Sequence, residues 1–293
     1  MALTETGANE SLELRLSLVL ATVGRTDEAV RFLASLDRQG VDDIELVVVD
    51  QNEDDRLVPL LAPYRDRFIV RHLRSAPGLS RARNVGLRAA TGDLLGFPDD
   101  DCWYPDGLLE RVIGFFDTHP DVDGLTGRAF GDDGATGRYD AQEGEVRLSN
   151  LWERGISFTI FLRQRVVARV GAFDERLGVG AGTPWGSGEE TDYLARAVEA
   201  GFRIRFDPAI AVGHPNPTAS YDAAALDRAR RYGMGWGHVL RRYAFPRRVV
   251  ARSFARPLGG AAIAAATGRF AKAKYHLEVL RSRWRGFRAG GVD

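Results

Sequence analysis

Three adjacent carboxylates form the strongest chemical signal in the sequence. Asp99, Asp100 and Asp101 directly follow a short apolar run at 94–97. Adjacent carboxylates repel one another unless a cation lies among them. Hard divalent cations such as Mg²⁺ and Mn²⁺ take oxygen ligands and often bridge to substrate phosphates. The triplet therefore predicts a site for one of these metals, and the alternative is an ordinary solvated acidic turn.

A second acidic group opens a predicted helix at 189–200. Glu189, Glu190 and Asp192 come directly after the glycine-rich segment 178–188. The helix dipole favours carboxylates at this end of a helix, which is a purely structural explanation. The chemical alternative is a general base that lies beneath a flexible glycine-rich cover.

Weaker candidates lie at the ends of other predicted elements. Asp50 ends an apolar strand, where its carboxylate is suited to accept a hydrogen bond from a base or a ribose. Arg81 and Arg83 flank a predicted helix start, where guanidinium groups would meet phosphates. His214 follows a short apolar run and is a candidate metal ligand or phosphate contact. Each has the alternative of an ordinary structural or surface residue.

Cysteine usage and hydropathy exclude several classes of protein. The single cysteine, Cys102, cannot form an intramolecular disulfide, which favours a reducing compartment. It lies beside the acidic triplet, where a thiolate is disfavoured, so we discount it as a nucleophile. The first residues lack a basic segment followed by an apolar run, so we expect no secretory signal. Because the sequence has no run of about 18 apolar residues, we expect no membrane span.

Alternating strands and helices are expected to position the candidate residues. Strands are predicted at 14–22, 44–49, 68–73 and 94–97, and helices begin near residues 27, 80 and 105. This order favours a mostly parallel sheet with helices on both faces. Ligands of such sheets bind at the carboxyl ends of the strands, where residues 22–25, 50–52 and 99–101 lie. Two further strands are predicted at 156–162 and 204–207, and a loop or hairpin at 131–144.

The composition describes a globular chain with two unlike parts. The 293 residues are 44% hydrophobic and 27% charged, and the formal net charge is zero, which excludes a disordered or collagen-like chain. Residues 225–293 hold 16 basic and three acidic residues, whereas residues 1–224 hold 24 basic and 37 acidic residues. Within the basic part, the segment 270–287 mixes basic and aromatic residues and resembles an interfacial amphipathic helix.

The motifs in their order resemble those of the family 2 glycosyltransferases, over residues 14–214. The segments that carry the resemblance are VLATVGR, IELVVVDQN, GLSRARNVGLRAATGDLLGFPDDDCWYPDGLLE, VGAFDERLG and GSGEETDYLARAVEAGFRI. The resemblance implies a GT-A-type α/β fold, with a Rossmann-like, mostly parallel sheet flanked by helices. It also implies an inverting transfer of a sugar from a nucleotide diphosphate donor to an acceptor hydroxyl.

The resemblance implies roles for residues around the donor. Asp99 and Asp101 would occupy the ends of the family's D-x-D motif. Asp101 would ligate Mn²⁺ or Mg²⁺ most directly, and Asp99 would hold the ribose or reach the metal through water. The metal would neutralise the leaving diphosphate. Asp50 would recognise the donor base, in a pocket lined by Thr22 and Arg25.

Further donor-site residues follow from the same resemblance. Arg83 and Asn84 match the family's A-R-N segment, whereas Arg81 is less typical. We place Asp100 with these donor-binding residues. His214 falls where family members often carry a histidine near the diphosphate, and it joins Asp99 and Asp101 as a metal ligand. The segment Asp50-Gln51-Asn52 departs from the more common second Asp, so uridine, thymidine and guanosine donors all stay open.

The acidic helix start carries the predicted base. The family commonly has Glu-Asp here, with the Asp as base, and Glu190 takes that place in this chain beside Glu189. Asp192 is the reserve base or a residue that orients the acceptor. Trp185, in the glycine-rich cover, is expected to bind the acceptor, because an aromatic face stacks on a sugar ring.

We expect a catalytic domain at 12–220 and a basic helical extension at 221–293. The extension is expected to dock on an anionic membrane surface, which would place the protein at the cytoplasmic face of the cell membrane, near a glycan or lipid-linked acceptor. The alternatives are packing of the extension against the catalytic domain, or a homodimer. The basic and aromatic residues form no known nucleic-acid reader, so no nucleic acid partner is expected.

Two rival functions use similar residues. A nucleotidyltransferase also places carboxylates and a metal at a strand end, but it usually opens with a glycine-rich, basic phosphate loop that VLATVGRTDEA lacks. A nucleotide-sugar-binding protein without transfer activity would not need the acidic helix start. An inverting, metal-dependent glycosyltransferase that acts in polysaccharide or cell-envelope glycan assembly is therefore the favoured function.

Overall fold

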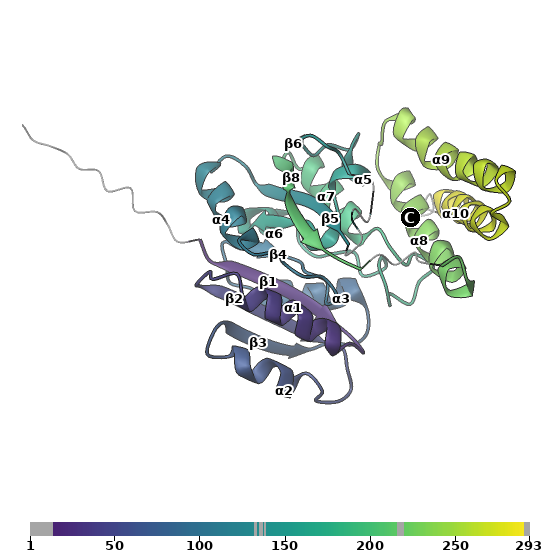
Figure 1. The fold of residues 1–293 in the computed structure, drawn as a ribbon. Helices are drawn as coiled ribbons and strands as arrows, with labels where there is room; N and C mark the ends of the chain where they lie inside the picture. The colour runs from purple at the N-terminus through teal and green to yellow at the C-terminus, as the bar shows by residue number, and fades with distance from the viewer. Residues whose placement is uncertain (1–13, 132–133, 135–136, 138, 216–219, 290–293) are drawn as a thin grey trace, which may run out of the picture.

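The computed structural model describes residues 14–131, 134, 137, 139–215 and 220–289 (Figure 1). Within these residues an eight-stranded sheet has the order β3-β2-β1-β4-β7-β5-β8-β6. The strands are β1 (Leu16–Thr22), β2 (Ile44–Asp50), β3 (Ile69–Arg74), β4 (Leu94–Gly96), β5 (Gly124–Phe130), β6 (Gly144–Glu145), β7 (Phe161–Arg163) and β8 (Ile204–Gly213).

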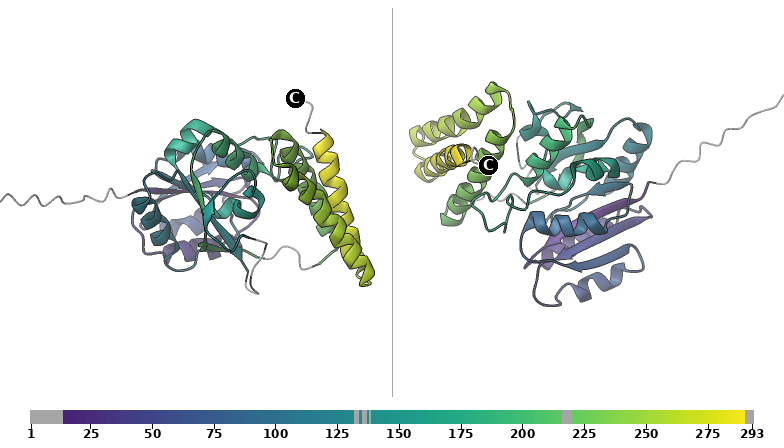
Figure 2. Two further views of the ribbon diagram at one scale, coloured as in Figure 1. Left: turned by 90° about the horizontal axis from the view of Figure 1, so that it is seen from above. Right: turned by 180° about the vertical axis from the view of Figure 1, so that it is seen from behind.

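Helices cover the sheet and continue beyond it as a separate layer. They are α1 (Asp27–Asp37), α2 (Val58–Leu61), α3 (Leu79–Ala89), α4 (Leu108–Thr118), α5 (Leu151–Arg154), α6 (Gln164–Val170), α7 (Glu189–Glu199), α8 (Ala223–Arg242), α9 (Arg247–Ala266) and α10 (Phe270–Ala289), with 3₁₀ turns η1 (Ala62–Tyr64) and η2 (Ser157–Thr159). Figures 1 and 2 show α8, α9 and α10 side by side at one side of the sheet.

The predicted parallel half of the sheet is confirmed. β1 pairs in parallel with both β2 and β4, and β2 pairs in parallel with β3. Every residue of β1 and β2 is buried, as expected for apolar strands that are covered on both faces. In this register Thr22 lies opposite Asp50, and Ala21 forms a bridge with Asp99. The ends of three strands therefore meet at one edge, which positions the candidate site.

The second half of the sheet differs from the prediction. β7 runs antiparallel to both β4 and β5, and β6 runs antiparallel to β8. The strand predicted at 156–162 divides into the turn η2 and the short β7. β8 continues to Gly213, well beyond the predicted end at 207, because its pairing with β5 resumes at Ala211 after an irregularity. Pro208 lies in that irregularity, and proline cannot donate a ladder hydrogen bond. The segment predicted as a loop at 131–144 lies partly outside the described residues.

The basic extension is helical, as predicted, and consists of α8, α9 and α10 in the described residues. The domain boundary at 220–221 stays a prediction. Glycines let α8 and α10 approach closely: a Cβ on Gly237 would lie 2.1 Å from the Arg283 carbonyl oxygen, and one on Gly286 would lie 2.0 Å from that of Met234. No helix in the described ranges is long and apolar enough to cross a membrane.

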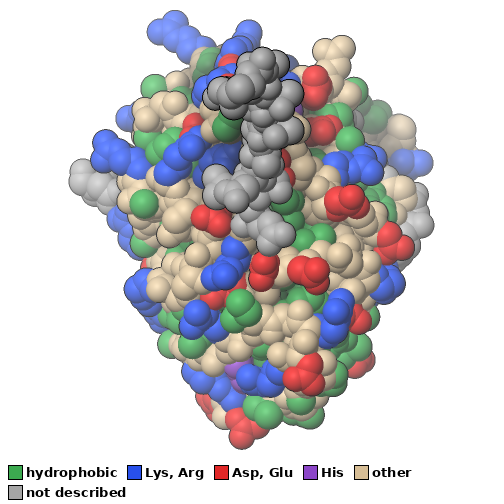
Figure 3. Space-filling view, turned by 90° about the vertical axis from the view of Figure 1, so that its left-hand side faces the viewer, with side chains coloured by type: hydrophobic (Ala, Val, Ile, Leu, Met, Phe, Trp, Pro, Cys, Tyr) green, Lys and Arg blue, Asp and Glu red, His purple; other side chains and the backbone are tan. Residues whose placement is uncertain are grey.

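The face opposite the extension shows basic and acidic side chains interspersed (Figure 3).

Candidate active site

The acidic triplet lies at the carboxyl edge of the sheet, directly after β4. The Thr22 hydroxyl, at the end of β1, donates a hydrogen bond to Asp100 Oδ2 at 2.7 Å. Arg25 Nη1 lies 2.5 Å from Asp100 Oδ1 and 2.6 Å from Asp101 Oδ2. The fold therefore brings Thr22, Arg25 and the triplet together, and Arg25 supplies the cation that adjacent carboxylates need.

His214, at the end of β8, completes a cluster that we call the acidic centre: Asp99, Asp100, Asp101 and His214. His214 Nε2 lies 3.1 Å from Asp101 Oδ1, and the imidazole stacks on the Phe158 ring with centroids 4.6 Å apart. Nδ1 lies 2.7 Å from the Pro215 carbonyl oxygen. With its proton on Nδ1, the imidazole donates a hydrogen bond to this carbonyl oxygen, and the lone pair of Nε2 is then available to bind a metal.

The acidic centre has the donor set of a divalent metal site. Ligand atoms of Asp99, Asp101 and His214 all lie within 4.8 Å of one another. Two carboxylate oxygens and one imidazole nitrogen suit Mn²⁺ well, and the carboxylates alone suit Mg²⁺. The residues present therefore fit the metal that the sequence predicts, and their protein partners already fix the orientation of the imidazole.

Burial and neighbouring charges set the acidity of the triplet. Burial raises the pKa of Asp99 to about 6, although the Arg83 charge opposes this shift. Burial also raises the pKa of Asp100. At Asp101 the effect of burial is outweighed by the hydrogen bond and charge of His214 and by Arg25, so its pKa lies below the usual value. Asp101 is therefore the most readily ionised carboxyl of the three.

A buried arginine connects the acidic centre to the start of α7. Arg83 Nη2 lies 3.0 Å from Asp99 Oδ1, and its Nη1 lies 3.3 Å from Glu189 Oε1. The Arg83 side chain is almost fully buried, and a buried cation needs such paired carboxylates. One guanidinium group thus holds the two acidic motifs of the sequence at a fixed separation.

Glu189 and Glu190 form a carboxyl pair at the N-terminus of α7. Burial, followed by the Glu189 charge, raises the pKa of Glu190 well above its usual value. A carboxylate with a raised pKa is a stronger base, as proton abstraction requires. The chain enters α7 through Gly188, whose φ of +95° favours glycine, and a Cβ there would lie 2.9 Å from Val239 Cγ2 of α8.

Asp192 is held by the extension. Its Oδ1 accepts hydrogen bonds from the Tyr243 hydroxyl at 2.5 Å and from Arg242 Nη1 at 3.0 Å, both at the end of α8. Its Oδ2 accepts from Arg196 Nε at 3.0 Å. Both oxygens of this fully buried carboxylate are therefore occupied, and its role as a reserve base stays a prediction.

Asp50 is saturated by groups of the chain itself. Its Oδ1 accepts hydrogen bonds from the backbone and side-chain amides of Asn52, at 2.9 and 2.7 Å. Its Oδ2 lies 2.9 Å from both His72 Nε2 and Arg74 Nη1. Contact with a donor base stays a prediction, and it requires one of these groups to move. Sequence reasoning missed His72, although the alternation of β3 places His72 and Arg74 on one face.

Only one of the three candidate donor residues on α3 lies beside the acidic centre. Arg81 is half-exposed, and its Nε lies 3.1 Å from Glu175 Oε2. Asn84 is buried, where its Nδ2 donates to the Phe173 carbonyl oxygen and its Oδ1 accepts from the Phe173 amide. Because successive helical residues point in different directions, Arg83 alone faces the carboxylates. The donor contacts of Arg81 and Asn84 stay predictions.

Trp185 packs against α8. Its ring stacks on His238 with centroids 4.0 Å apart, and the Arg176 guanidinium lies 5.9 Å from the ring centroid. The Gly178 amide donates to the Trp185 carbonyl oxygen at 3.0 Å, which closes the glycine-rich loop on itself. The indole is half-buried, so its acceptor contact stays a prediction.

Two residues near the acidic centre carried no recognisable signal in the sequence. Ser157, in η2, has its hydroxyl 3.4 Å from Asp99 Oδ2. Tyr232, on α8, has a pKa raised first by burial and then by the charges of Glu189, Asp99 and Glu190. Since only tertiary packing brings α8 to these carboxylates, the extension contributes to the site in a way that local motifs do not reveal.

The fold and the site define a GT-A-type protein. The structure is similar to that of residues 1–349 of TarS from Staphylococcus aureus in complex with UDP-GlcNAc, with a TM-score of 0.60, 18% identity, and coverage of 93% of this chain and 92% of that chain. It is also similar to the mannosyltransferase PcManGT from Pyrobaculum calidifontis in complex with GDP-Man and Mn²⁺. The TM-score is 0.65 and the identity 16%, and the match covers 92% of this chain and 87% of that chain. At these identities the likeness concerns the fold.

The sequence defines the family. The family model of glycosyl transferase family 2 matches residues 17–173, and the chain belongs to that family. The Pre-mycofactocin glycosyltransferase of Mycobacterium tuberculosis is 30% identical over 165 residues, which cover 52% of this chain and 33% of the relative. The match thus spans about a third of the length of that relative.

Proposed function

We propose that the protein transfers a sugar from a nucleoside diphosphate donor to an acceptor hydroxyl, with inversion, and that the transfer requires Mn²⁺ or Mg²⁺. The observation that carries this proposal is the Arg83 bridge between Asp99 and Glu189. It holds Asp99 of the candidate metal site close to Glu189, and the next residue, Glu190, is the carboxyl whose pKa is raised. Metal and base are the two groups that an inverting displacement of a diphosphate needs.

The acidic centre would bind the donor. Asp101, His214 and Asp99 would hold the metal, which supplies Lewis-acid stabilisation of the leaving diphosphate. Arg25 now neutralises Asp100 and Asp101. With a metal bound by the carboxylates, the half-exposed guanidinium of Arg25 would be free to bind the diphosphate oxygens. Thr22 would keep Asp100 oriented through its hydrogen bond.

Glu190 would act as the general base. As the acceptor oxygen forms its bond to the sugar carbon, the hydroxyl proton moves to the Glu190 carboxylate and the bond to the diphosphate breaks. Arg83 keeps Glu189 in place through an ion pair. A protein that only binds nucleotide sugars has no use for this carboxyl pair, which favours transfer over the binding-only alternative.

A thermal-shift panel tests the donor site. The protein is mixed with nucleoside diphosphates and nucleotide sugars, each with Mn²⁺, Mg²⁺ or EDTA. Because a ligand that binds the folded state raises the melting temperature, we expect a shift with one nucleotide that EDTA removes. A cooperative melt that no nucleotide shifts, with or without metal, would contradict the proposal.

Trp185 is proposed to contact the acceptor. Replacing Trp185 with alanine is expected to raise KM for the acceptor about three- to tenfold, because a stacking contact is lost, and to leave KM for the donor unchanged. Trp284→Ala, at the exposed Trp284 of α10, is the matched control. The melting temperature of each variant is measured as well, since Trp185 also stacks on His238. An unchanged acceptor KM would count against this role.

The extension is proposed to bind an anionic membrane surface at the cytoplasmic face of the cell membrane, close to a glycan or lipid-linked acceptor. Exposed apolar side chains lie in the second half of α9 and at the start of α10: Leu258, Ile263 and Phe270 are 56%, 68% and 73% exposed. Arg269 and Lys272 lie beside them. A basic residue near an anionic membrane surface contributes about 1 kcal/mol. The alternative of packing against the catalytic domain is realised by α8, through contacts such as that of Arg242 with Asp174.

Vesicle sedimentation tests this surface. We expect the protein to sediment with phosphatidylcholine vesicles only when they contain phosphatidylglycerol, and the double variant Leu258→Ser/Phe270→Ser to lose most of that binding. Val58→Ser, which changes an exposed apolar residue of the catalytic domain, is the control. Binding that does not depend on anionic lipid would overturn the proposal.

A further inference from the structure

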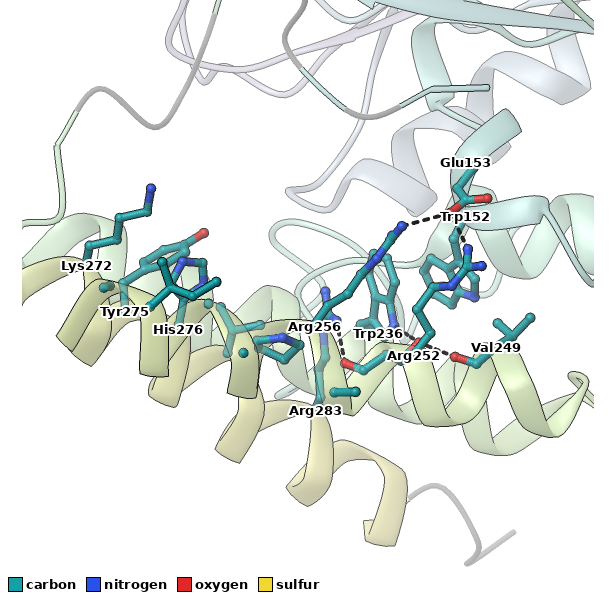
Figure 4. Close-up of a pocket in the computed structure, with 18 of the residues that line it drawn as sticks. Trp152, Glu153, Trp236, Val249, Arg252, Arg256, Lys272, Tyr275, His276 and Arg283 are labelled. Carbon is teal, nitrogen blue, oxygen red and sulfur yellow. Dashed lines mark hydrogen bonds and ion pairs between the residues drawn. The ribbon is translucent and has the colours of Figure 1, made fainter. Parts of the chain in front are cut away.

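A basic cavity lies between α5 and the helices of the extension, apart from the acidic centre. Its volume is about 840 Å³, which lies in the range of small-molecule sites. Residues of α5, α8, α9 and α10 line it, and Figure 4 shows their side chains directed toward a shared space. The acidic motifs of the catalytic domain contribute no residue to this lining.

One end of the cavity carries more positive than negative charge. Arg252 Nη1 and Arg256 Nη2 lie 2.7 and 3.3 Å from the same oxygen, Glu153 Oε1. Arg283 is a third guanidinium group at this end, as Figure 4 shows. Glu153 is the only acidic residue in the described lining. Two guanidinium groups therefore share one carboxylate oxygen and a third lies near them, which is an arrangement that an added anion stabilises.

Packing rather than a carboxylate holds Arg283 in place. Its Nη1 donates to the Ser253 carbonyl oxygen at 2.7 Å, and the guanidinium lies 4.0 Å from the Trp236 ring centroid. Trp236 in turn stacks on Trp152 with centroids 3.6 Å apart. Arg283 Nε is buried and has no hydrogen-bond partner among the described residues. Burial lowers the pKa of Arg283 to about 10; the Arg256 charge acts in the same direction and Tyr275 opposes it.

The other end and the wall of the cavity differ in chemistry. Lys272, Tyr275 and His276 lie at the far end from the guanidinium groups (Figure 4). Between the two ends, the wall formed by α9 is small and apolar, with Gly259, Gly260, Ile263 and Ala264. A Cβ on Gly260 would lie 2.9 Å from the His276 ring, so this glycine lets the imidazole of α10 pack closely against α9. An elongated ligand with an anionic group at one end matches this shape.

We propose that the basic cavity binds a phosphate or diphosphate ester, the acidic group of the acceptor, through Arg252, Arg256 and Arg283. The proposal deepens the proposed function, since it names the chemical class of the acceptor. Three guanidinium groups offer more N–H donors than the two oxygens of a carboxylate can accept, whereas a phosphate group has three terminal oxygens. The planar guanidinium fork also matches phosphate geometry.

The position of the cavity supports its assignment to the acceptor. Trp236, whose ring packs against the Arg283 guanidinium, lies one helical turn from Tyr232 in α8. The Ser187 hydroxyl, two residues before the carboxyl pair, donates to the Tyr232 carbonyl oxygen at 2.9 Å, and a Cβ on Gly188 would lie 3.4 Å from the carbonyl oxygen of Gly235. One helix thus borders both the basic cavity and the proposed base. A single extended acceptor, with its phosphate in the cavity, would present a hydroxyl to Glu190.

Titration with inorganic pyrophosphate in EDTA tests the cavity, since removal of metal suppresses binding at the acidic centre. The double variant Arg252→Gln/Arg256→Gln is expected to weaken binding about tenfold or more, because two charge-assisted contacts are lost. Both side chains are half-exposed, so folding is retained, and the melting temperature verifies this. Arg248→Gln/Arg281→Gln removes the same charge from exposed positions of α9 and α10 outside the cavity and is expected to change little.

A second arm distinguishes a lipid from a soluble source of the phosphate. Phosphatidylcholine vesicles with or without phosphatidic acid replace pyrophosphate. Loss of binding only in the cavity variant supports the proposal in either arm, and the arm that shows it identifies the source. The proposal is overturned if, in both arms, the two double variants lose binding equally or neither loses it. The Glu190→Gln variant distinguishes this proposal from the proposed function, because it should lose transfer activity but still bind pyrophosphate. If the unaltered protein binds pyrophosphate in the cavity but transfers no sugar, the proposed function is refuted and the phosphate site is not.

Discussion

Replacement of Glu190 by glutamine is expected to lower the rate of glycosyl transfer by about 10²- to 10⁴-fold and to leave donor affinity unchanged. The amide keeps the size of the side chain but cannot take the acceptor proton. Glu190 is suited to that task because burial and the neighbouring Glu189 raise its pKa. Initial rates and a nucleotide-binding measurement on the same preparation check both parts of the prediction.

The pH dependence of the rate follows from the same shift. A base must be unprotonated, so activity is lost as the pH falls through the pKa of Glu190. Because that pKa is raised, the loss begins at a higher pH than for an ordinary glutamate, whose pKa is about 4.3. The residual activity of Glu190→Gln should lack this acidic limb.

Matched variants make the assignment of the base specific. Glu199→Gln makes the same chemical change at the exposed end of α7, where we expect no effect. Asp192→Asn tests the reserve base, with the melting temperature measured because Arg196, Arg242 and Tyr243 all bind Asp192. A Glu190→Gln protein with the original rate would refute the assignment of Glu190 as the base. If the Asp192→Asn protein were then folded but inactive, Asp192 would be the base instead.

Replacement of Asp101 by asparagine is expected to remove most metal-dependent activity. Asp101 is the most readily ionised carboxyl of the acidic centre and lies beside His214 Nε2. Lewis-acid stabilisation of a leaving group is worth several kcal/mol, and each 1.36 kcal/mol is tenfold in rate, so we expect a loss of about 10²- to 10³-fold. EDTA should cause a similar loss in the unaltered protein, and Mn²⁺ should reverse it.

The exposed Asp106 provides the control for this substitution. It lies five residues further along the chain, and its nearest ion pair is a 3.4 Å contact with Arg38 on the surface. Asp106→Asn should therefore keep both activity and the metal-dependent thermal shift. Full activity of the unaltered protein in EDTA would exclude a metal-dependent mechanism, whatever the behaviour of the Asp101 variant.

The sequence was sufficient to predict the parallel half of the sheet. β1, β2 and β4 are short runs of residues buried on both faces, so their local pattern and their pairing agree. Because parallel strands end at a common edge, the meeting of Thr22, Asp50 and Asp99 followed from the same pattern. The register of these ends needed no information from distant residues.

Other features depend on contacts between distant segments. Asp192 and Tyr243 are 51 residues apart, and no local pattern links the helix start to the end of α8. The orientation of Arg81 and Asn84 depends on how α3 rotates against the sheet and the segment around Phe173. The three-residue β7 is too short for a periodicity, and its antiparallel direction is set by its neighbours β4 and β5. Long-range packing decided each of these outcomes.

The hydrogen bonds of Asp192 with Arg242 and Tyr243 also join the first turn of α7 to the end of α8. A chain that ended before α8 would leave this fully buried carboxylate with Arg196 as its remaining side-chain partner. Because these contacts also keep water from Asp192, loss of α8 would remove two hydrogen-bond partners and expose the carboxylate to solvent. We therefore expect the extension to contribute to the stability of the first turn of α7.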